Sequence, residues 1–219
     1  MGTATILSEK HRAFIEQQKM FFVATAAREG RVNLSPKGMD TLRITEENQI
    51  VWLSLSGSGN ETAAHLLDTP RMTLMFCAFE GDALILRTYG TARAIHPHDV
   101  EWPDYLSLFP ALAGTRQIYI QDIDMVQTSC GTGVPEMQFS RSRGETELVP
   151  YYNDMGVDGV QAYWRRKNTK SIDGLPTGIF SECAAATSPD SVLLCACVNT
   201  GVNLCDQTKA RAMPRANSG

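Results

Sequence analysis

The sequence lacks long hydrophobic runs, an excess of basic residues and an apolar N-terminal signal core. No apolar stretch approaches the roughly 18 residues that a membrane-spanning helix needs, so we expect no membrane partner. The 20 basic and 24 acidic residues give a formal net charge of −4, which argues against nucleic acid, because phosphate backbones bind to basic surfaces. Without a signal core, the chain is expected to be cytoplasmic.

Paired cysteine motifs are also missing. Six cysteines among 219 residues are too few for a disulfide scaffold. Four of them fall late in the chain, where four thiols could bind zinc, but they lack the C-x-x-C spacing of a zinc site. Core packing or a loosely ordered tail is therefore favoured over metal binding. We therefore assign no metal site; these late cysteines are Cys183, Cys195, Cys197 and Cys205.

The hydrophobic content of 43% is sufficient for a folded core, and it is arranged mainly in short strands. Apolar or alternating segments are separated by turn residues, and helices are expected only at interruptions. This pattern predicts a mainly β fold with flanking helices, an antiparallel barrel that is closed or partly closed. The six predicted strands cover 20–27, 31–35, 50–55, 72–79, 83–95 and 116–126.

Helices are predicted around residues 5–18, 60–68, 97–106 and 159–167, and residues 136–158 are expected to be irregular. After residue 181 the composition shifts to Ala, Ser, Thr and Cys, with one candidate strand at 191–198 and a loose end. The expected organisation is an N-terminal helix at 1–20, a barrel domain at 21–139, an extension at 140–180 and a tail at 181–219.

The strongest candidate site is a predicted strand, a Gly-rich turn and a helix start between Ser54 and Thr62. Backbone N–H groups of such a turn, together with the positive end of a helix, bind phosphate or another anion. The alternative is a capping box in which Ser58 and Glu61 satisfy the helix start themselves. Side-chain donors are added by Ser56, Ser58, Asn60 and Thr62, and Gly59 belongs to the Gly-rich turn itself.

A second candidate is the polar face of the strand that precedes Lys37. Arg31, Asn33 and Ser35 alternate with apolar residues and therefore share one face, which is either solvated or part of a ligand groove. Arg87 interrupts a half-buried strand, as an edge-strand feature or as a ligand group.

A third candidate is the loop that contains Ser129 and Cys130. A thiol in a Gly-rich loop is a nucleophile only with a base and a lowered pKa, and no Cys/His motif lies near it. Inert packing is the alternative.

As a set, several motifs resemble the pyridoxamine 5′-phosphate oxidase-like family of FMN-binding split barrels, and more closely a fungal and bacterial subgroup of it. The resemblance covers about two thirds of the chain, mainly from Phe21 to Phe139. The motifs are LSPKG at 34–38, GSGNET at 57–62, RMTLMFCAF at 71–79, LRTYG at 86–90, QTSCGTGVP at 127–135 and SIDGLP at 171–176.

The resemblance implies a six-stranded split β-barrel that forms a homodimer and holds two FMN molecules at the dimer interface. It places the FMN phosphate at the turn from Ser54 to Thr62, and the flavin and ribityl chain beside Lys37 and the Arg31 strand. The implied cofactor-binding residues are Arg31, Asn33, Ser35, Lys37, Ser54, Ser56, Ser58, Gly59, Asn60, Thr62, Arg87, Ser129 and Cys130.

The implied activity is that of an FMN-dependent flavoprotein oxidoreductase acting on a small molecule, with NAD(P)H as a candidate electron donor. The resemblance supplies no catalytic acid or base. The chain carries Glu61-Thr62 where oxidases of the family carry a basic pair, and the C-terminal Arg and Trp region that oxidases use for pyridoxal substrates is not evident. Pyridoxamine phosphate oxidation is therefore not the expected reaction. A flavin- or haem-binding protein without turnover is the alternative on the same barrel.

Overall fold

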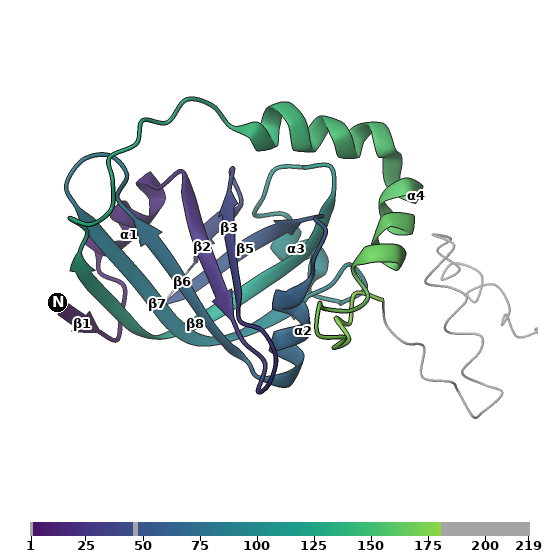
Figure 1. Cartoon of the computed structure of the whole chain (residues 1–219), viewed down its shortest axis with the longest axis horizontal. Coiled ribbons are helices and arrows are strands. Elements are labelled where there is room, and N and C mark those ends of the chain that lie inside the picture. The colour runs from purple at the N-terminus through teal and green to yellow at the C-terminus, as the bar shows by residue number, and fades with distance from the viewer. Residues whose placement is uncertain (1, 46–47, 181–219) are drawn as a thin grey trace, which may run out of the picture. The chain divides into compact units, whose positions relative to one another are not determined.

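The computed structural model describes residues 2–45 and 48–180. In it, eight antiparallel strands form one strongly curved sheet (Figure 1). The main path runs β3-β2-β6-β7-β8-β5-β4, and β1 pairs with β8. The strands are β1 (Gly2–Ala4), β2 (Met20–Thr25), β3 (Asn33–Gly38), β4 (Leu42–Ile44), β5 (Gln49–Leu55), β6 (Arg71–Cys77), β7 (Leu84–Ile95) and β8 (Thr115–Cys130).

The predicted fold class is confirmed, and the six predicted strands are β2, β3, β5, β6, β7 and β8. The structure adds β1 and β4, which have three residues each. Three residues are too short for a period of two to be visible in a sequence.

The core lies on the inner face of the curved sheet. Burial alternates along β2, as expected for a strand with one face covered. Aromatic rings from three strands fill the centre: Trp52 stacks on Tyr119 with centroids 4.4 Å apart and meets Phe21 edge to face at 6.1 Å. This packing holds β2, β5 and β8 together next to the site described below.

The close approach of the paired strands β7 and β8 requires a glycine at one position. The strand register shifts between Tyr89 and Gly90, which marks a bulge. A Cβ atom at Gly90 would lie 1.9 Å from the carbonyl oxygen of Asp122. No other residue therefore fits at this position without moving β8.

The helices flank the sheet, and one of them corrects a prediction. Helices α1 (Glu9–Gln17), α2 (Glu61–Asp68) and α3 (Trp102–Leu106) fall within predicted segments. In contrast, the expected irregular stretch at 136–158 is wrong over much of its length. A π-helical turn η1 (Gly144–Leu148) leads directly into α4 (Val149–Lys167).

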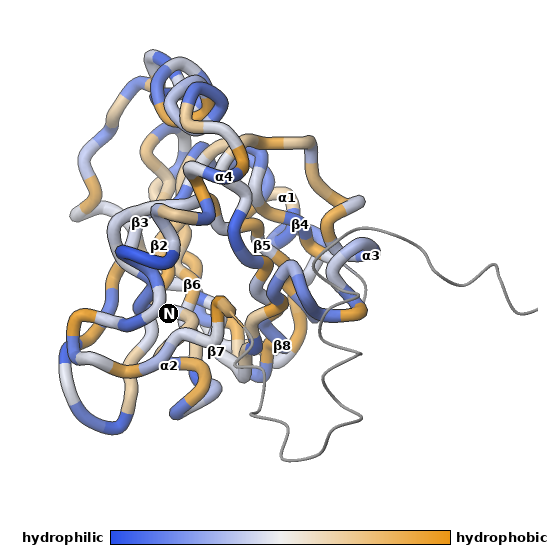
Figure 2. Tube along the Cα trace, turned by 90° about the vertical axis from the view of Figure 1, so that its right-hand side faces the viewer, coloured by the Kyte–Doolittle hydropathy of each residue, from blue (hydrophilic) through white to orange (hydrophobic). Residues whose placement is uncertain are grey.

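The cause of this error lies in the apolar pattern of α4. Its buried residues are Tyr152, Val160 and Trp164, spaced in multiples of four, but Gly156 occupies the intervening position. Gly156 has φ 69° and kinks the helix, so the apolar stripe is interrupted. Hydrophilic positions dominate the rest of α4 (Figure 2).

Within the described residues, no helix combines the length and the apolar character that crossing a membrane requires. The predictions for the tail, including its cysteines and the strand at 191–198, lie outside the described residues.

Candidate functional site

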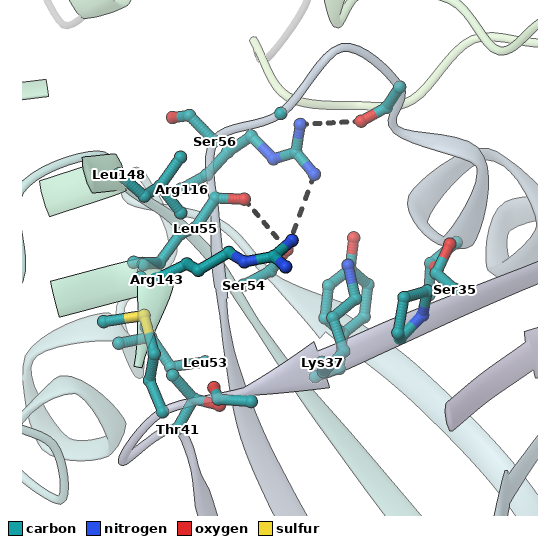
Figure 3. A pocket seen from close by; sticks show the side chains of 18 of the residues that line it. Ser35, Lys37, Thr41, Leu53, Ser54, Leu55, Ser56, Arg116, Arg143 and Leu148 are labelled. Atoms are coloured by element: carbon teal, nitrogen blue, oxygen red, sulfur yellow. Dashed lines mark hydrogen bonds between the residues drawn. The ribbon is translucent and has the colours of Figure 1, made fainter. Parts of the chain in front are cut away.

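A cavity of about 1190 Å³ opens between one edge of the sheet, the start of α2 and the C-terminal extension. Its walls come from β3, from β5 and the turn after it, from the segment around η1 and from the residues after α4. In Figure 3 the charged ends of Lys37, Arg116 and Arg143 point into the same space. The cavity therefore combines polar backbone with several cations.

Lys37 reaches the cavity because β3 turns its polar face inward. Lys37 pairs with the buried Phe21 of β2, and residues directly opposite each other in a sheet share a face. The apolar residues of this strand region lie outside: Val32 and Leu34 are 73% and 63% exposed. Burial, together with the nearby charge of Arg116, lowers the pKa of Lys37 to about 8.

Arg116, at the start of β8, is the main site residue that sequence reasoning missed. It is only 4% exposed, and it donates hydrogen bonds to the Gly59 carbonyl oxygen at 2.9 Å and to Ser54 Oγ at 3.4 Å. Its Nε has no partner among the described residues, and no carboxylate there forms an ion pair with it. A buried guanidinium held by neutral oxygens alone is electrostatically incomplete.

The sequence did contain a signal for Arg116. Arg116 is the only charged residue among the first six positions of the predicted strand 116–126, and the structure buries the five residues that follow it, through Gln121. The same pattern singled out Arg87 in the sequence but not Arg116.

The start of α2 is left open toward the cavity. Its N-cap is Asn60, whose side chain makes no capping hydrogen bond. The capping box between Ser58 and Glu61 does not form, because Glu61 Oε1 accepts the backbone N–H of Ile172 at 2.9 Å. Of the two alternatives for this turn, self-capping is thus the one that the geometry does not support.

The cavity gathers eight of the thirteen predicted cofactor-binding residues. These contribute a strand face, the end of β5 and the turn before α2, which the sequence pattern had treated as separate candidates. The eight are Ser35, Lys37, Ser54, Ser56, Ser58, Gly59, Asn60 and Thr62.

Two of the other five residues are engaged elsewhere near the turn. Arg31 lies just before β3 and forms an ion pair with Asp173. Asn33 faces inward, but its amide donates hydrogen bonds to Thr25 and Thr62 rather than opening into the cavity.

The last three residues lie on β7 and β8, away from this cavity. Arg87 donates a hydrogen bond to Ser129 Oγ at 3.3 Å. Cys130 is exposed, and its hydrogen bond with Thr132 lowers the pKa of its thiol. Within the described part of the chain, Thr132 Oγ1 is the only side-chain hydrogen-bond partner of the Cys130 thiol.

A curved antiparallel sheet with a basic cavity at a strand–turn–helix defines the fold class as a split β-barrel. The family model described as "Pyridoxamine 5'-phosphate oxidase" matches residues 7–127, and the chain belongs to this family. This confirms the family resemblance seen in the sequence.

The chain also resembles one relative in sequence and several solved structures more distantly. The chain is 32% identical over 186 residues to the pyridoxamine 5′-phosphate oxidase family protein ustO of Aspergillus flavus, covering 78% of this chain and 75% of that protein. The solved structure of a putative pyridoxamine 5′-phosphate oxidase from Lactobacillus delbrueckii is 14% identical, with a TM-score of 0.46, covering 58% of this chain and 99% of that one. HupZ of Group A Streptococcus, in an H111A form, is 16% identical, with a TM-score of 0.47, 56% of this chain and 99% of that one being covered.

Proposed function

We propose that this protein is an FMN-dependent oxidoreductase that binds the FMN phosphate at the turn between β5 and α2. The observation that carries the proposal is the pair of inward-facing cations, Lys37 and Arg116, that no carboxylate neutralises in an ion pair within the described residues. Burying a cation is costly unless an anion accompanies it, so a bound anion would complete this site.

The residues present fit a phosphate monoester. Arg116 offers an unpartnered Nε, and the start of α2 offers backbone N–H groups that the side chain of its N-cap, Asn60, does not cap. Ser58 and Gly59 are exposed in the turn, and a Cβ at Gly57 would meet nothing within 4 Å. Two cations and an uncapped helix start thus provide what the missing basic pair supplies in oxidases of the family.

FMN, when bound, supplies hydride and electron transfer; the protein binds and orients it. Lys37 would hold positive charge beside the cofactor, and its Nζ lies 5.4 Å from the ring centroid of Trp52, where it is partly shielded from water. We assign no catalytic acid or base. The substrate is proposed to be a small molecule, and NAD(P)H is the candidate electron donor.

A second copy of the chain would complete the site. The outer side of the β3 edge exposes Val32 and Leu34, which are large apolar residues that a partner would cover. We therefore propose a homodimer with residues of both copies around each FMN.

The variants Lys37→Ala and Arg116→Gln test the proposal directly. Each should weaken FMN binding at least tenfold, because each removes a charge-assisted contact to phosphate. Arg93→Gln is the matched control, because Arg93 forms an exposed ion pair with Glu101 away from the cavity. Far-UV circular dichroism establishes that the variants are folded, and unchanged affinity in both folded variants would contradict the assignment.

One assay distinguishes the proposed oxidoreductase from the alternative function, cofactor binding without turnover. Bleaching of bound flavin by NAD(P)H followed by reoxidation supports an oxidoreductase, whereas bound flavin that no nicotinamide reduces supports storage. His65 of α2 offers no haem ligand, because it is 1% exposed and its Nδ1 lies within hydrogen-bonding distance of Thr25 Oγ1, at 3.1 Å.

A further inference from the structure

The segment after the family-model match folds back onto the turn that forms the anion site. The match ends at residue 127, yet residues 164–173 contact the turn and the start of α2 through side chains and backbone. Trp164 Nε1 donates a hydrogen bond of 2.7 Å to Ser56 Oγ, and both residues are buried. In Figure 1 this segment lies beside α2 at the base of α4.

Asn168 joins the two ends of the turn. It is fully buried, and its Nδ2 donates a hydrogen bond of 2.9 Å to the Gly57 carbonyl oxygen. The backbone carbonyl oxygen of Asn168 accepts hydrogen bonds from the Asn60 side-chain amide at 3.2 Å and from the Thr177 hydroxyl at 2.6 Å. A single residue therefore contacts the turn at both Gly57 and Asn60.

Glu61 contributes a contact from the other side. Its Oε1 accepts the Ile172 N–H, and its Oε2 would lie 2.4 Å from a Cβ on Gly59. The negative charge of the Glu61 carboxylate thus repels an anion. The hydrogen bond that its Oε1 accepts from the Ile172 N–H holds the extension against α2. These two effects have opposite consequences for anion affinity, which makes them separable by substitution.

We propose that residues 164–173 act as a clamp that holds the turn at 56–60 in its anion-binding conformation, with Asn168 and Glu61 as positioning residues. The proposal rests on the proposed function for the identity of the anion. Preorganised backbone N–H groups bind an anion more tightly than mobile ones, because the ordering entropy is lost before binding.

Two readouts test the clamp, and one of them needs no ligand. Amide hydrogen exchange of residues 56–63 in the ligand-free protein reports whether the turn is held. FMN titration reports whether that order sets affinity. The variants are Asn168→Ala, the control Asn153→Ala on the exposed side of α4, and the pair Glu61→Gln and Glu61→Ala.

The clamp predicts a distinct pattern. Asn168→Ala should speed exchange of the turn at least tenfold and weaken FMN binding at least tenfold, whereas Asn153→Ala should change neither. Glu61→Gln keeps an oxygen acceptor and removes the charge, so it should bind FMN as tightly as the wild type or more tightly. Glu61→Ala releases Ile172 and should bind FMN more weakly than Glu61→Gln.

Three results would overturn the inference. Unchanged exchange in Asn168→Ala shows that the Asn168 side chain does not hold the turn and overturns its role as a positioning residue. Faster exchange with unaltered FMN affinity shows that the turn's order does not set binding, and equal affinity of the two Glu61 variants shows that only the charge matters. A wild-type chain that binds no FMN contradicts the proposed function instead, while the exchange result still decides whether the turn is held.

Discussion

Lys37 and Arg116 lie in one cavity, and the charge of Arg116 makes the protonated form of Lys37 less favourable. Burial and Arg116 together bring the pKa of Lys37 to about 8, which is within reach of ordinary buffers. Whether Lys37 is charged then decides how well the cavity attracts an anion.

The charge of Lys37 predicts a pH dependence of FMN binding. Affinity should be constant near pH 7 and fall as the pH rises through about 8, because deprotonated Lys37 no longer attracts the phosphate. The phosphate itself, with a second pKa of about 6, stays dianionic over this range. Fluorescence titration between pH 7 and 10 measures the effect. Lys37→Arg should bind independently of pH, and an equally steep fall in that variant would argue against Lys37.

His96 is the residue whose titration affects folding. Burial, the neighbouring His98 ring and the charge of Arg116 lower its pKa to about 4, although Asp99 opposes the shift. Gln117 Nε2 lies 3.2 Å from His96 Nδ1 and is itself buried. Neutral His96 is therefore the form that the folded chain accommodates.

This predicts a loss of stability in weak acid. Between pH 6.5 and 4 the unfolded chain binds a proton at His96 that the folded chain does not. The free energy of unfolding therefore decreases by up to about 3 kcal/mol as the pH is lowered through this range. Urea unfolding at pH 7.5 and 4.5 measures the difference. The variant His96→Gln should lose this part of the pH dependence, and an unchanged slope would show that other groups cause it.

At the residue scale, the sequence revealed those site residues that sit in a motif. Ser54, Ser58 and Lys37 belong to recognisable turn or strand patterns, and they line the cavity. The partner of Arg31 is Asp173, 142 residues away, and no local pattern indicates such an ion pair. Arg116 looked like a strand end, and only its three-dimensional surroundings make it a site residue.

At the scale of elements, the bulge between β7 and β8 sets the curvature of the sheet near the core. Gly90 permits the close approach of the two backbones there, and the register shift increases local twist. Substitution at this point should therefore affect the whole sheet rather than a single contact.

Gly90→Ala should destabilise the protein by about 1–3 kcal/mol, because its Cβ would overlap the Asp122 carbonyl oxygen and β8 would have to move. Chemical denaturation measures this change. Gly133→Ala is the control, since a Cβ there would meet nothing within 4 Å. Equal stability of the two variants would contradict the steric account of the bulge.

Elements with a regular period were predictable, and those with an interrupted one were not. Short apolar runs and alternating segments, separated by turn residues, predict six of the eight strands. The apolar stripe of helix α4 is interrupted at Gly156. Its buried face contacts residues that are distant in the sequence, such as Ser56. Its role at the site follows from that long-range packing, which is invisible along the chain.

At the scale of the whole molecule, the proposed function requires two copies. The exposed apolar side chains at the β3 edge indicate where a second copy would bind. We expect a dimer in sedimentation at micromolar concentration. Leu34 is 63% exposed in one copy, and Leu34→Glu should both shift the monomer–dimer equilibrium toward monomer and reduce FMN binding. A wild-type protein that is monomeric and binds FMN normally would contradict a site shared between two copies.

The central claim is that the basic cavity binds FMN, and an FMN titration followed by visible absorption tests it most directly. The account predicts a flavin spectrum that remains after gel filtration, near one FMN per chain, with a low-micromolar or tighter dissociation constant. Arg116→Gln should lose most of this binding while retaining its circular dichroism. A folded wild-type protein that stays colourless and takes up no FMN at micromolar concentration would contradict the account.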